Sequence, residues 1–228
     1  HAAVFDSKGF LYVATARYNR ILKFNSQYQE VEGWDKSLRD QKALNMPVAL
    51  DVGESDSIYV TNWEPEGIIH VDAKGKLLHT FSSTGTVKIR PHGISFSSKH
   101  QRVFVADRVY EGGAGTIHVF STEGIYLSSW SKPNAEFDPL NIRPISDDLW
   151  FVPDYFDGKI YIFDISGRVI EKLELLGVEP GRFQRATSVA IDNEGFAYIT
   201  ELNGNRVQKI DFKPVLQKSE QALQSLQK

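Results

Sequence analysis

A strand pattern that recurs at a nearly constant interval constrains this chain more than any other feature. Five segments rich in β-branched and aromatic residues, the residue types that favour strands, each carry a central Val or Ile. These aligned residues are Val13, Val60, Val105, Val152 and Ile199. The intervals between them are 47, 45, 47 and 47 residues. Unrelated strands would not keep such a period, so the sequence predicts a series of structurally equivalent units.

Each unit shows the same internal order of apolar strands and polar turns. A first apolar strand, a polar turn and the aligned strand are followed by a third strand, which reads NRILKFN, GIIHVDA, TIHVFST, KIYIFDI or NRVQKID. In four units another turn leads to a predicted fourth strand, which reads QEVEGW, KLLHTFS, IYLSSW or VIEKLEL. Gly75, Gly124 and Gly167 mark three of these turns, because glycine tolerates the positive φ that tight turns require.

Four antiparallel strands in about 45 residues form the pattern of a β-propeller blade. No such unit can bury both of its sheet faces alone, whereas packing against neighbouring units buries them. A β-sandwich of unrelated hairpins is the alternative, and the regular period disfavours it. We therefore predict an all-β chain with five blades at about 1–40, 46–84, 90–132, 138–176 and 184–216. The polar tail 217–228 could form a short helix or fray.

The fifth unit shows three strands and then the segment FKPVL. An uncovered sheet edge invites aggregation, so a fourth strand is expected from some source. Residues 213–216 could supply it within a five-bladed ring, or a partner chain could cover it. We favour a third interpretation, in which the chain derives from a six-bladed propeller with one preceding blade not represented.

Composition narrows the class of function. The 228 residues carry a net charge of −3 and no cysteine. Nucleic-acid-binding domains are usually strongly basic, so that role is disfavoured. The lack of cysteine excludes a disulfide scaffold, an iron–sulfur cluster and a thiolate zinc site. It suits a reducing compartment and also a secreted protein without disulfides. No apolar run reaches the roughly 18–20 residues that cross a bilayer.

The residue just before each first strand is expected to face the mouth of a central channel, where ligands usually bind. His1 and His92 hold this position in the first and third units, and Thr187 holds it in the fifth. Imidazoles from separate blades can bind one divalent ion, so His1 and His92 are candidate metal ligands. A strong catalytic zinc site needs a third ligand. The competing interpretation is that each histidine only satisfies a turn.

A second ring of candidate ligand-binding residues follows the aligned strand. It contains Asp107, Asp154 and Glu201, with Arg108 and Tyr155 next in sequence to the first two. The carboxylates could collect a cation or a basic ligand. More commonly, an acid at such a place accepts hydrogen bonds from the backbone of the adjoining loop, and we give this interpretation more weight.

Three loops are candidate contact surfaces for a protein or peptide: 62–67, 108–116 and 154–158. Trp63 lies in the first of them beside two acids. An exposed tryptophan can anchor a partner, although a tryptophan packed between blades is the commoner case. The glycines of 108–116 do not form a phosphate-binding loop, since no Lys-Ser or Lys-Thr follows them.

The motifs resemble the NHL-repeat family. The resemblance is carried by PHGISF, RVFVADR and TIHVFSTEG in the third unit, and by EPGRFQRA and VAIDNEGFAYITELNGNRVQKIDF around the fifth. It covers residues 1–212 and implies a propeller, commonly with six blades. These motifs identify the scaffold specifically but give little evidence for any one activity, because this scaffold hosts unrelated functions.

Within that family, the arrangement resembles the peptidyl-amidoglycolate lyase propeller, in which three histidines hold zinc while an arginine and a tyrosine flank the substrate. His1 and His92 match the first two metal positions, and Arg108 matches the arginine. Thr187 stands in place of the third histidine, and Trp63 or Tyr155 would have to replace the tyrosine. The resemblance also implies a calcium ion in the channel, held partly by the blade expected to be missing.

Two functions follow from this sequence. The first, which we favour, is a binding module that presents its loops to a protein or peptide ligand. The second is a lyase or hydrolase that uses a divalent metal, zinc or calcium, with Arg108 binding an anionic group.

Overall fold

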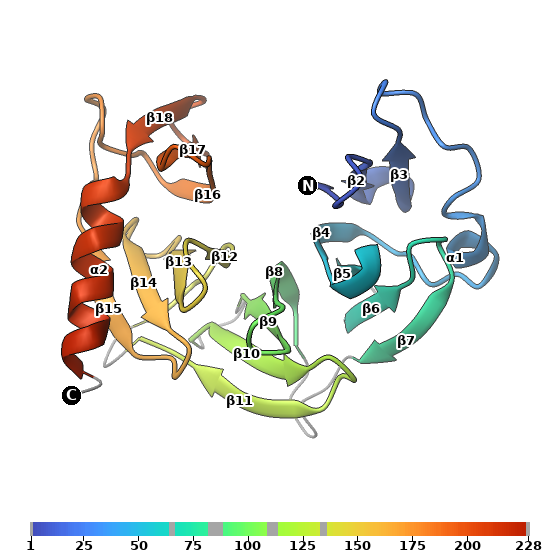
Figure 1. Ribbon diagram of the computed structural model, residues 1–228, viewed down its shortest axis with the longest axis horizontal. Coiled ribbons are helices and arrows are strands. Elements are labelled where there is room, and N and C mark those ends of the chain that lie inside the picture. Colours follow the sequence, from blue (N-terminus) through green and yellow to red (C-terminus); the bar gives the residue numbers. More distant parts are fainter. Residues whose placement is uncertain (1, 64–66, 82–88, 109–113, 133–135, 227–228) are drawn as a thin grey trace. The chain divides into compact units, whose positions relative to one another are not determined.

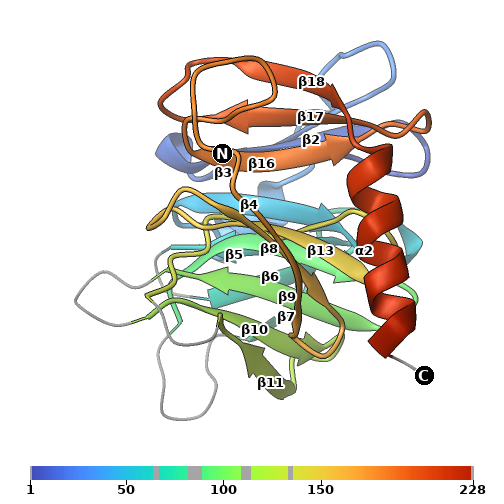
Figure 2. The same ribbon diagram turned by 90° about the vertical axis from the view of Figure 1, so that its left-hand side faces the viewer.

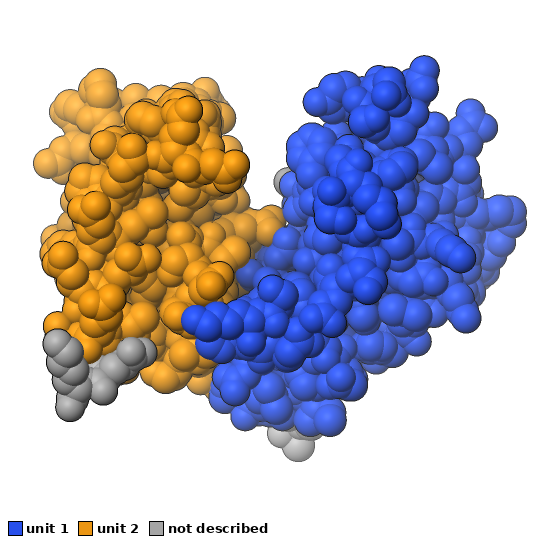
Figure 3. Space-filling model, in the orientation of Figure 1, with its two compact units in different colours: residues 1–107, 118–128 blue, residues 108–117, 129–228 orange. Residues whose placement is uncertain are grey.

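The computed structural model describes residues 2–63, 67–81, 89–108, 114–132 and 136–226 of the chain (Figure 1). Five antiparallel sheets contain nearly all of its regular structure, so the prediction of an all-β chain is confirmed. The chain divides into two compact units (Figure 3). Unit 1 comprises residues 1–107 and 118–128, and unit 2 comprises 108–117 and 129–228.

The first three sheets follow one another along the chain. The first contains β1 (Ala3–Phe5), β2 (Leu11–Thr15) and β3 (Arg20–Phe24). The second contains β4 (Pro47–Val52), β5 (Ile58–Asn62), β6 (Gly67–Val71) and β7 (Leu77–Phe81). The third contains β8 (Pro91–Ser97), β9 (Arg102–Asp107), β10 (Thr116–Ser121) and β11 (Tyr126–Trp130). In each sheet, strands that are consecutive in sequence are hydrogen-bonded neighbours.

The last two sheets belong to unit 2. One contains β12 (Arg143–Pro144), β13 (Leu149–Pro153), β14 (Ile160–Asp164) and β15 (Val169–Leu173). The other contains β16 (Ala186–Ile191), β17 (Phe196–Glu201) and β18 (Val207–Asp211). Short helices η1 (Ala16–Tyr18), η2 (Glu54–Asp56) and α1 (Lys36–Asp40) lie between strands, and α2 (Lys213–Leu226) follows the last one. Figures 1 and 2 both show α2 alongside the fourth sheet, where it contacts β15.

Each unit is held together by apolar side chains that one sheet presents to the next. In unit 1, Tyr12 and Ile21 from the first sheet share a buried cluster with Val60 and Ile69 from the second. In unit 2, Phe151 and Ile162 from the fourth sheet pack in one cluster with Val189 and Ile199 from the fifth, and Leu223 of α2 joins them. The period predicted this mode of burial, because each blade needs a neighbour to cover its face.

The turn between the third and fourth strands has the same geometry wherever it was predicted from glycine. Gly75, Gly124 and Gly167 have φ of +86°, +84° and +81°, respectively. Three residues before each of them, a side-chain oxygen of Asp72, Ser121 or Asp164 accepts the backbone N–H groups two and four residues further on. A short polar side chain and a left-handed residue thus close each hairpin.

The predicted fourth strand of the first unit is wrong. Within QEVEGW, only Glu30 pairs with the sheet, in an isolated bridge to Phe24. Gly33 then turns the backbone with a φ of +72°, and α1 follows. Trp34 packs edge-on against Tyr12, with ring centroids 5.1 Å apart, and its Nε1 donates a hydrogen bond to the Ala73 carbonyl. A buried tryptophan and the helix α1 therefore follow β3 where a fourth strand was expected.

Residues 213–216 do not supply an edge strand, because they form the first turn of α2. The Lys213 amide donates to the Asp211 side chain just before the helix. Val215, Leu216 and Leu223 pack against the cluster of unit 2, so apolar residues at helical spacing bind this segment to the fourth sheet. No helix in the described part of the chain is long and apolar enough to cross a membrane.

Candidate functional site

The three acids predicted after the aligned strand are buried. Asp107 ends β9, Asp154 follows β13 and Glu201 ends β17, and their exposed fractions are 7%, 1% and 7%. In each case a carboxylate oxygen accepts the backbone N–H of the loop before the first strand of the same sheet. The donors are the amides of Arg90, Asp138 and Gln184, at 2.7, 3.1 and 2.7 Å. Asn62 of the second sheet accepts the Asn45 amide in the same way.

The second oxygen of each carboxylate meets a donor side chain that sequence reasoning did not single out. His118 Nε2 lies 3.0 Å from Asp107, Lys132 Nζ lies 2.5 Å from Asp154, and Arg206 Nε lies 2.6 Å from Glu201. Burial alone would raise the pKa of Glu201, but hydrogen bonds from Arg206 and the Gln184 amide outweigh it and lower that pKa. These acids therefore join local backbone to local side chains, and their lone pairs are largely occupied.

Arg108 and Tyr155, the two residues predicted to act on a ligand, lie together in unit 2. The Arg108 guanidinium donates to both carboxylate oxygens of Asp138, at 2.7 and 2.6 Å. Its Cζ atom lies 4.8 Å from the centre of the Tyr155 ring. The Tyr155 amide donates to the Asp138 carbonyl at 2.9 Å, so the segment around Asp138 positions both side chains. All three residues come from loops that precede or follow strands.

Arg185 completes this group and was missed in the sequence. Its Cζ atom lies 4.2 Å from the Tyr155 ring centre, so two guanidinium groups contact one aromatic ring. Within the part of the chain that the structure describes, Arg185 has no ion-pair partner. We call Arg108, Asp138, Tyr155 and Arg185 the arginine–tyrosine cluster. The position of Arg185 could have indicated a role in the site, since Arg185 directly precedes β16 and residues at this place were expected to face the channel.

The backbone at Arg185 is in the left-handed region, with a φ of +62°. Met46, which directly precedes the first strand of the second sheet, has a φ of +50°. Because Met46 and Arg185 occupy equivalent positions and share this conformation, we attribute it to the loop that leads into the first strand of a sheet. What distinguishes Arg185 is its side chain, and strain alone gives no argument for function.

The remaining predicted residues make contacts of their own within their sheets. Thr187 is half-buried in β16, and its Oγ1 lies 2.7 Å from Thr200 Oγ1. Trp63 is half-buried, and its amide donates to the Met46 carbonyl. Parts of two predicted contact loops, 64–66 and 109–113, lie outside the described residues. The third loop, 154–158, is described and carries Tyr155 and the exposed Phe156.

The predicted metal pair stays a prediction. His92 lies in β8 and is half-buried, and its carbonyl accepts a hydrogen bond from Thr61 Oγ1 at 3.0 Å. His1 lies outside the described residues. No group of three or more histidines and carboxylates that could hold a metal ion occurs in the ranges that the structure describes. The described residues therefore offer no complete ligand set for zinc or calcium.

Comparison with solved structures decides the architecture. A virginiamycin B lyase from Staphylococcus aureus matches 92% of this chain with a TM-score of 0.67 and 15% sequence identity. A chain of a nidogen/laminin complex matches 93% of it with a TM-score of 0.69 and 16% identity. The fold is a β-propeller. At such low identity the comparison shows the fold alone. The similar structures are themselves diverse, since one is a lyase and another comes from a protein complex.

The propeller of this chain spans 66% of the length of the virginiamycin B lyase and 75% of the matched chain of the nidogen/laminin complex. A streptogramin B lyase structure also matches 92% of the chain, which spans 65% of it, with a TM-score of 0.67 and 16% identity. No protein-family model matches the chain, so the NHL-type and amidoglycolate lyase resemblances stay predictions.

Proposed function

We propose that this propeller is a binding module, and that the arginine–tyrosine cluster of unit 2 receives a carboxylate group of a protein or peptide ligand. The observation that carries the proposal is the Arg185 guanidinium, which stacks on Tyr155 at 4.2 Å and has no ion-pair partner in the described part of the chain. An arginine held in place by an aromatic ring loses less conformational freedom when it binds a carboxylate.

The charge of the cluster supports an anionic ligand. Arg108 is neutralised by its two hydrogen bonds to Asp138, whereas no described carboxylate forms an ion pair with Arg185. The cluster therefore carries a net positive charge in a chain whose net charge is −3. Arginine forks match the two oxygens of a carboxylate and form charge-assisted hydrogen bonds that are stronger than neutral ones.

An apolar side chain adjacent to the cluster supports a macromolecular ligand. Phe156 follows Tyr155 and is 60% exposed. Aromatic residues, phenylalanine included, and arginine are enriched at protein interfaces relative to the rest of the surface. One of the similar propellers comes from a structure of a nidogen/laminin complex, and this lends support to a propeller that acts through protein contacts.

The test is a titration with the peptide acetyl-Glu-Phe-Glu-amide, followed by calorimetry, against its glutamine analogue acetyl-Gln-Phe-Gln-amide. We expect the acidic peptide to bind at least about tenfold more tightly, because only a carboxylate can pair with Arg185, and tenfold corresponds to about 1.4 kcal/mol. Arg185→Gln should remove most of that preference.

Arg17→Gln provides the matched control, since Arg17 is an exposed arginine of unit 1 and the substitution removes the same charge. It should leave the preference for the acidic peptide unchanged. Equal loss in both variants would show that the net charge of the surface is responsible. Equal binding of the two peptides would show that no carboxylate is recognised, and either result would rule out the proposed site.

A further inference from the structure

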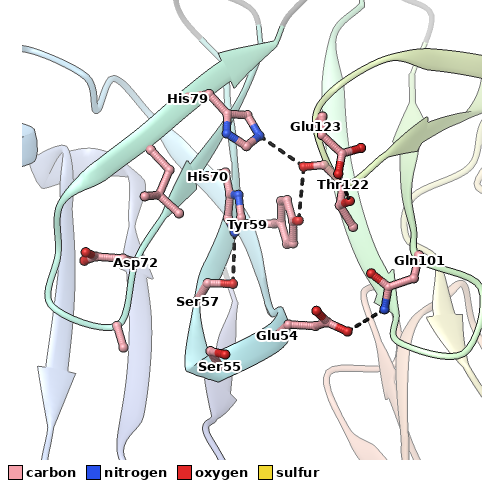
Figure 4. Close-up of a pocket in the computed structure, with 12 residues that line it drawn as sticks. Glu54, Ser55, Ser57, Tyr59, His70, Asp72, His79, Gln101, Thr122 and Glu123 are labelled. Atoms are coloured by element: carbon pink, nitrogen blue, oxygen red, sulfur yellow. Dashed lines mark hydrogen bonds between the residues drawn. The ribbon is translucent and has the colours of Figure 1, made fainter.

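A pocket in unit 1 lies between the second and third sheets. Its volume is about 410 Å³. The turns of both sheets line it, as Figure 4 shows, and the strands β5, β6 and β7 supply Tyr59, His70 and His79. All of its lining residues belong to unit 1. The binding function proposed above does not use any of them.

The lining of the pocket carries negative charge. Glu54, Asp72 and Glu123 contribute carboxylates, and no lysine or arginine is among the described residues that line it. None of the three carboxylates forms an ion pair within the described residues. Figure 4 shows Asp72 and Glu123 on opposite sides of the two histidines. Uncompensated charge of one sign in a concave site raises the local concentration of ions of the opposite sign.

The two histidines form a fixed aromatic wall. The His70 ring stacks on Tyr59 with ring centroids 4.0 Å apart and an interplanar angle of 9°. His79, its cross-strand partner, meets it edge-on at 4.9 Å. His70 Nε2 lies 2.9 Å from Ser57 Oγ, so the ring is held on two sides. Burial, reinforced by the neighbouring His79, lowers the pKa of His70 to about 4, so this ring adds no positive charge at neutral pH.

The hydrogen-bonding capacity of the pocket is biased towards acceptors. His79 Nε2 lies 3.1 Å from the Thr122 carbonyl, which can only accept, so Nε2 donates this hydrogen bond, and in the neutral tautomer with that proton Nδ1 is an acceptor. The Tyr59 hydroxyl donates to the same carbonyl, and the Gln101 amide donates to Glu54 and the Ser98 carbonyl. His70 Nδ1 is buried and has no partner in the described structure. A buried polar atom without a partner is costly.

We propose that this pocket binds an organic cation with several N–H donors, and that the guanidinium group of an arginine side chain fits it best. A guanidinium presents five donors and no acceptor, which complements a lining of carboxylates and an imidazole acceptor. Its flat face also stacks on aromatic rings, and here the imidazole wall provides them. A compact divalent metal ion is a poorer match, because no group of three metal-ligating side chains occurs in the described parts of the chain.

The experiment compares acetyl-arginine methylamide with acetyl-citrulline methylamide, which has nearly the same shape and no charge. Binding is followed by calorimetry and by NMR signals of the histidine rings. We expect the arginine compound to bind at least about tenfold more tightly and to shift the His79 ring signals. Glu123→Gln should reduce this preference, because it removes one carboxylate of the lining. Glu123 is exposed, so the substitution should not disturb the core.

Glu32→Gln is the matched control, since Glu32 is also an exposed glutamate of unit 1 and does not line the pocket. It should leave the preference for arginine unchanged. Agmatine and the peptide Gly-Arg-Gly, tested side by side, distinguish a free small amine from a peptide side chain as the source of the guanidinium. Equal binding of the arginine and citrulline compounds, or an unchanged preference in Glu123→Gln, would overturn the proposal.

Discussion

Replacing Lys132 with methionine should lower the free energy of unfolding by about 3–5 kcal/mol, because it leaves the buried Asp154 carboxylate without a counter-charge. The Lys132 side chain is 4% exposed and lies 2.5 Å from Asp154 Oδ2 and 3.1 Å from Asp157 Oδ2, whose side chains are 0% and 19% exposed. Methionine keeps the length and the apolar contacts of the stem but not the ammonium. The measurement is urea unfolding of the purified variant.

Lys36→Met is the control for this substitution. Lys36 pairs with Asp40 at the surface, where the two side chains are 67% and 59% exposed, and an exposed pair of this kind contributes about 0.5 kcal/mol or less. The double variant Lys132→Met, Asp154→Asn should regain part of the loss, since it removes the uncompensated charge together with its partner. If Lys132→Met cost no more than Lys36→Met, the buried ion cluster would have no role in stability.

The same cluster should make unfolding sensitive to acid. Burial alone would raise the pKa of Asp157, but hydrogen bonds from Tyr161, the Lys159 amide and Lys132 outweigh it and lower that pKa. A carboxyl group whose pKa is lower in the folded state contributes stability above its ordinary pKa and loses it as the pH falls through the lowered value. In Lys132→Met this contribution should shrink, so the variant and the parent should differ less at low pH than at neutral pH.

The fold was predictable because its determinants are local and repeated. The period of the aligned strands located β2, β5, β9, β13 and β17, and alternation within each unit located their neighbours. The turn glycines followed from the same repetition. Exceptions occurred where a single unit departs from the repeat: the buried Trp34 and α1 stand where the first unit was expected to have a fourth strand, and α2 follows β18 directly, with its apolar residues packed on the fourth sheet.

The candidate site was only half predictable, because its contacts join residues that are distant in sequence. Arg108 and Tyr155 could be named from their place after aligned strands. Asp138, which holds Arg108 across 30 residues, has no local signal. For Arg185, which contacts the Tyr155 ring, the only signal was its position directly before β16. The pocket of unit 1 escaped notice for a similar reason: His70 and His79 look like ordinary strand residues until β6 and β7 pair them side by side.

Replacing Gly167 with alanine should lower the free energy of unfolding by about 2–4 kcal/mol, the sum of a left-handed backbone penalty and overpacking. Gly167 has a φ of +81°, and a Cβ atom built on it would lie 2.2 Å from Cδ1 of Trp130. The Trp130 ring cannot easily yield, because it is 3% exposed and packs against Trp150 and Phe163. Alanine at this turn therefore has to displace either the hairpin or a buried tryptophan.

Gly181→Ala separates the two causes. Gly181 lies in the same unit with a φ of +80°, and a Cβ atom there would meet nothing within 4 Å. It should cost only about 1–2 kcal/mol, the backbone penalty alone, while Gly167→Ala should also alter the tryptophan fluorescence, because it displaces Trp130. Equal losses in the two variants would mean that the hairpin moves freely over Trp130. A clearly larger loss for Gly167→Ala would show that glycine is required because the turn that contains Gly167 packs directly on the Trp130 ring.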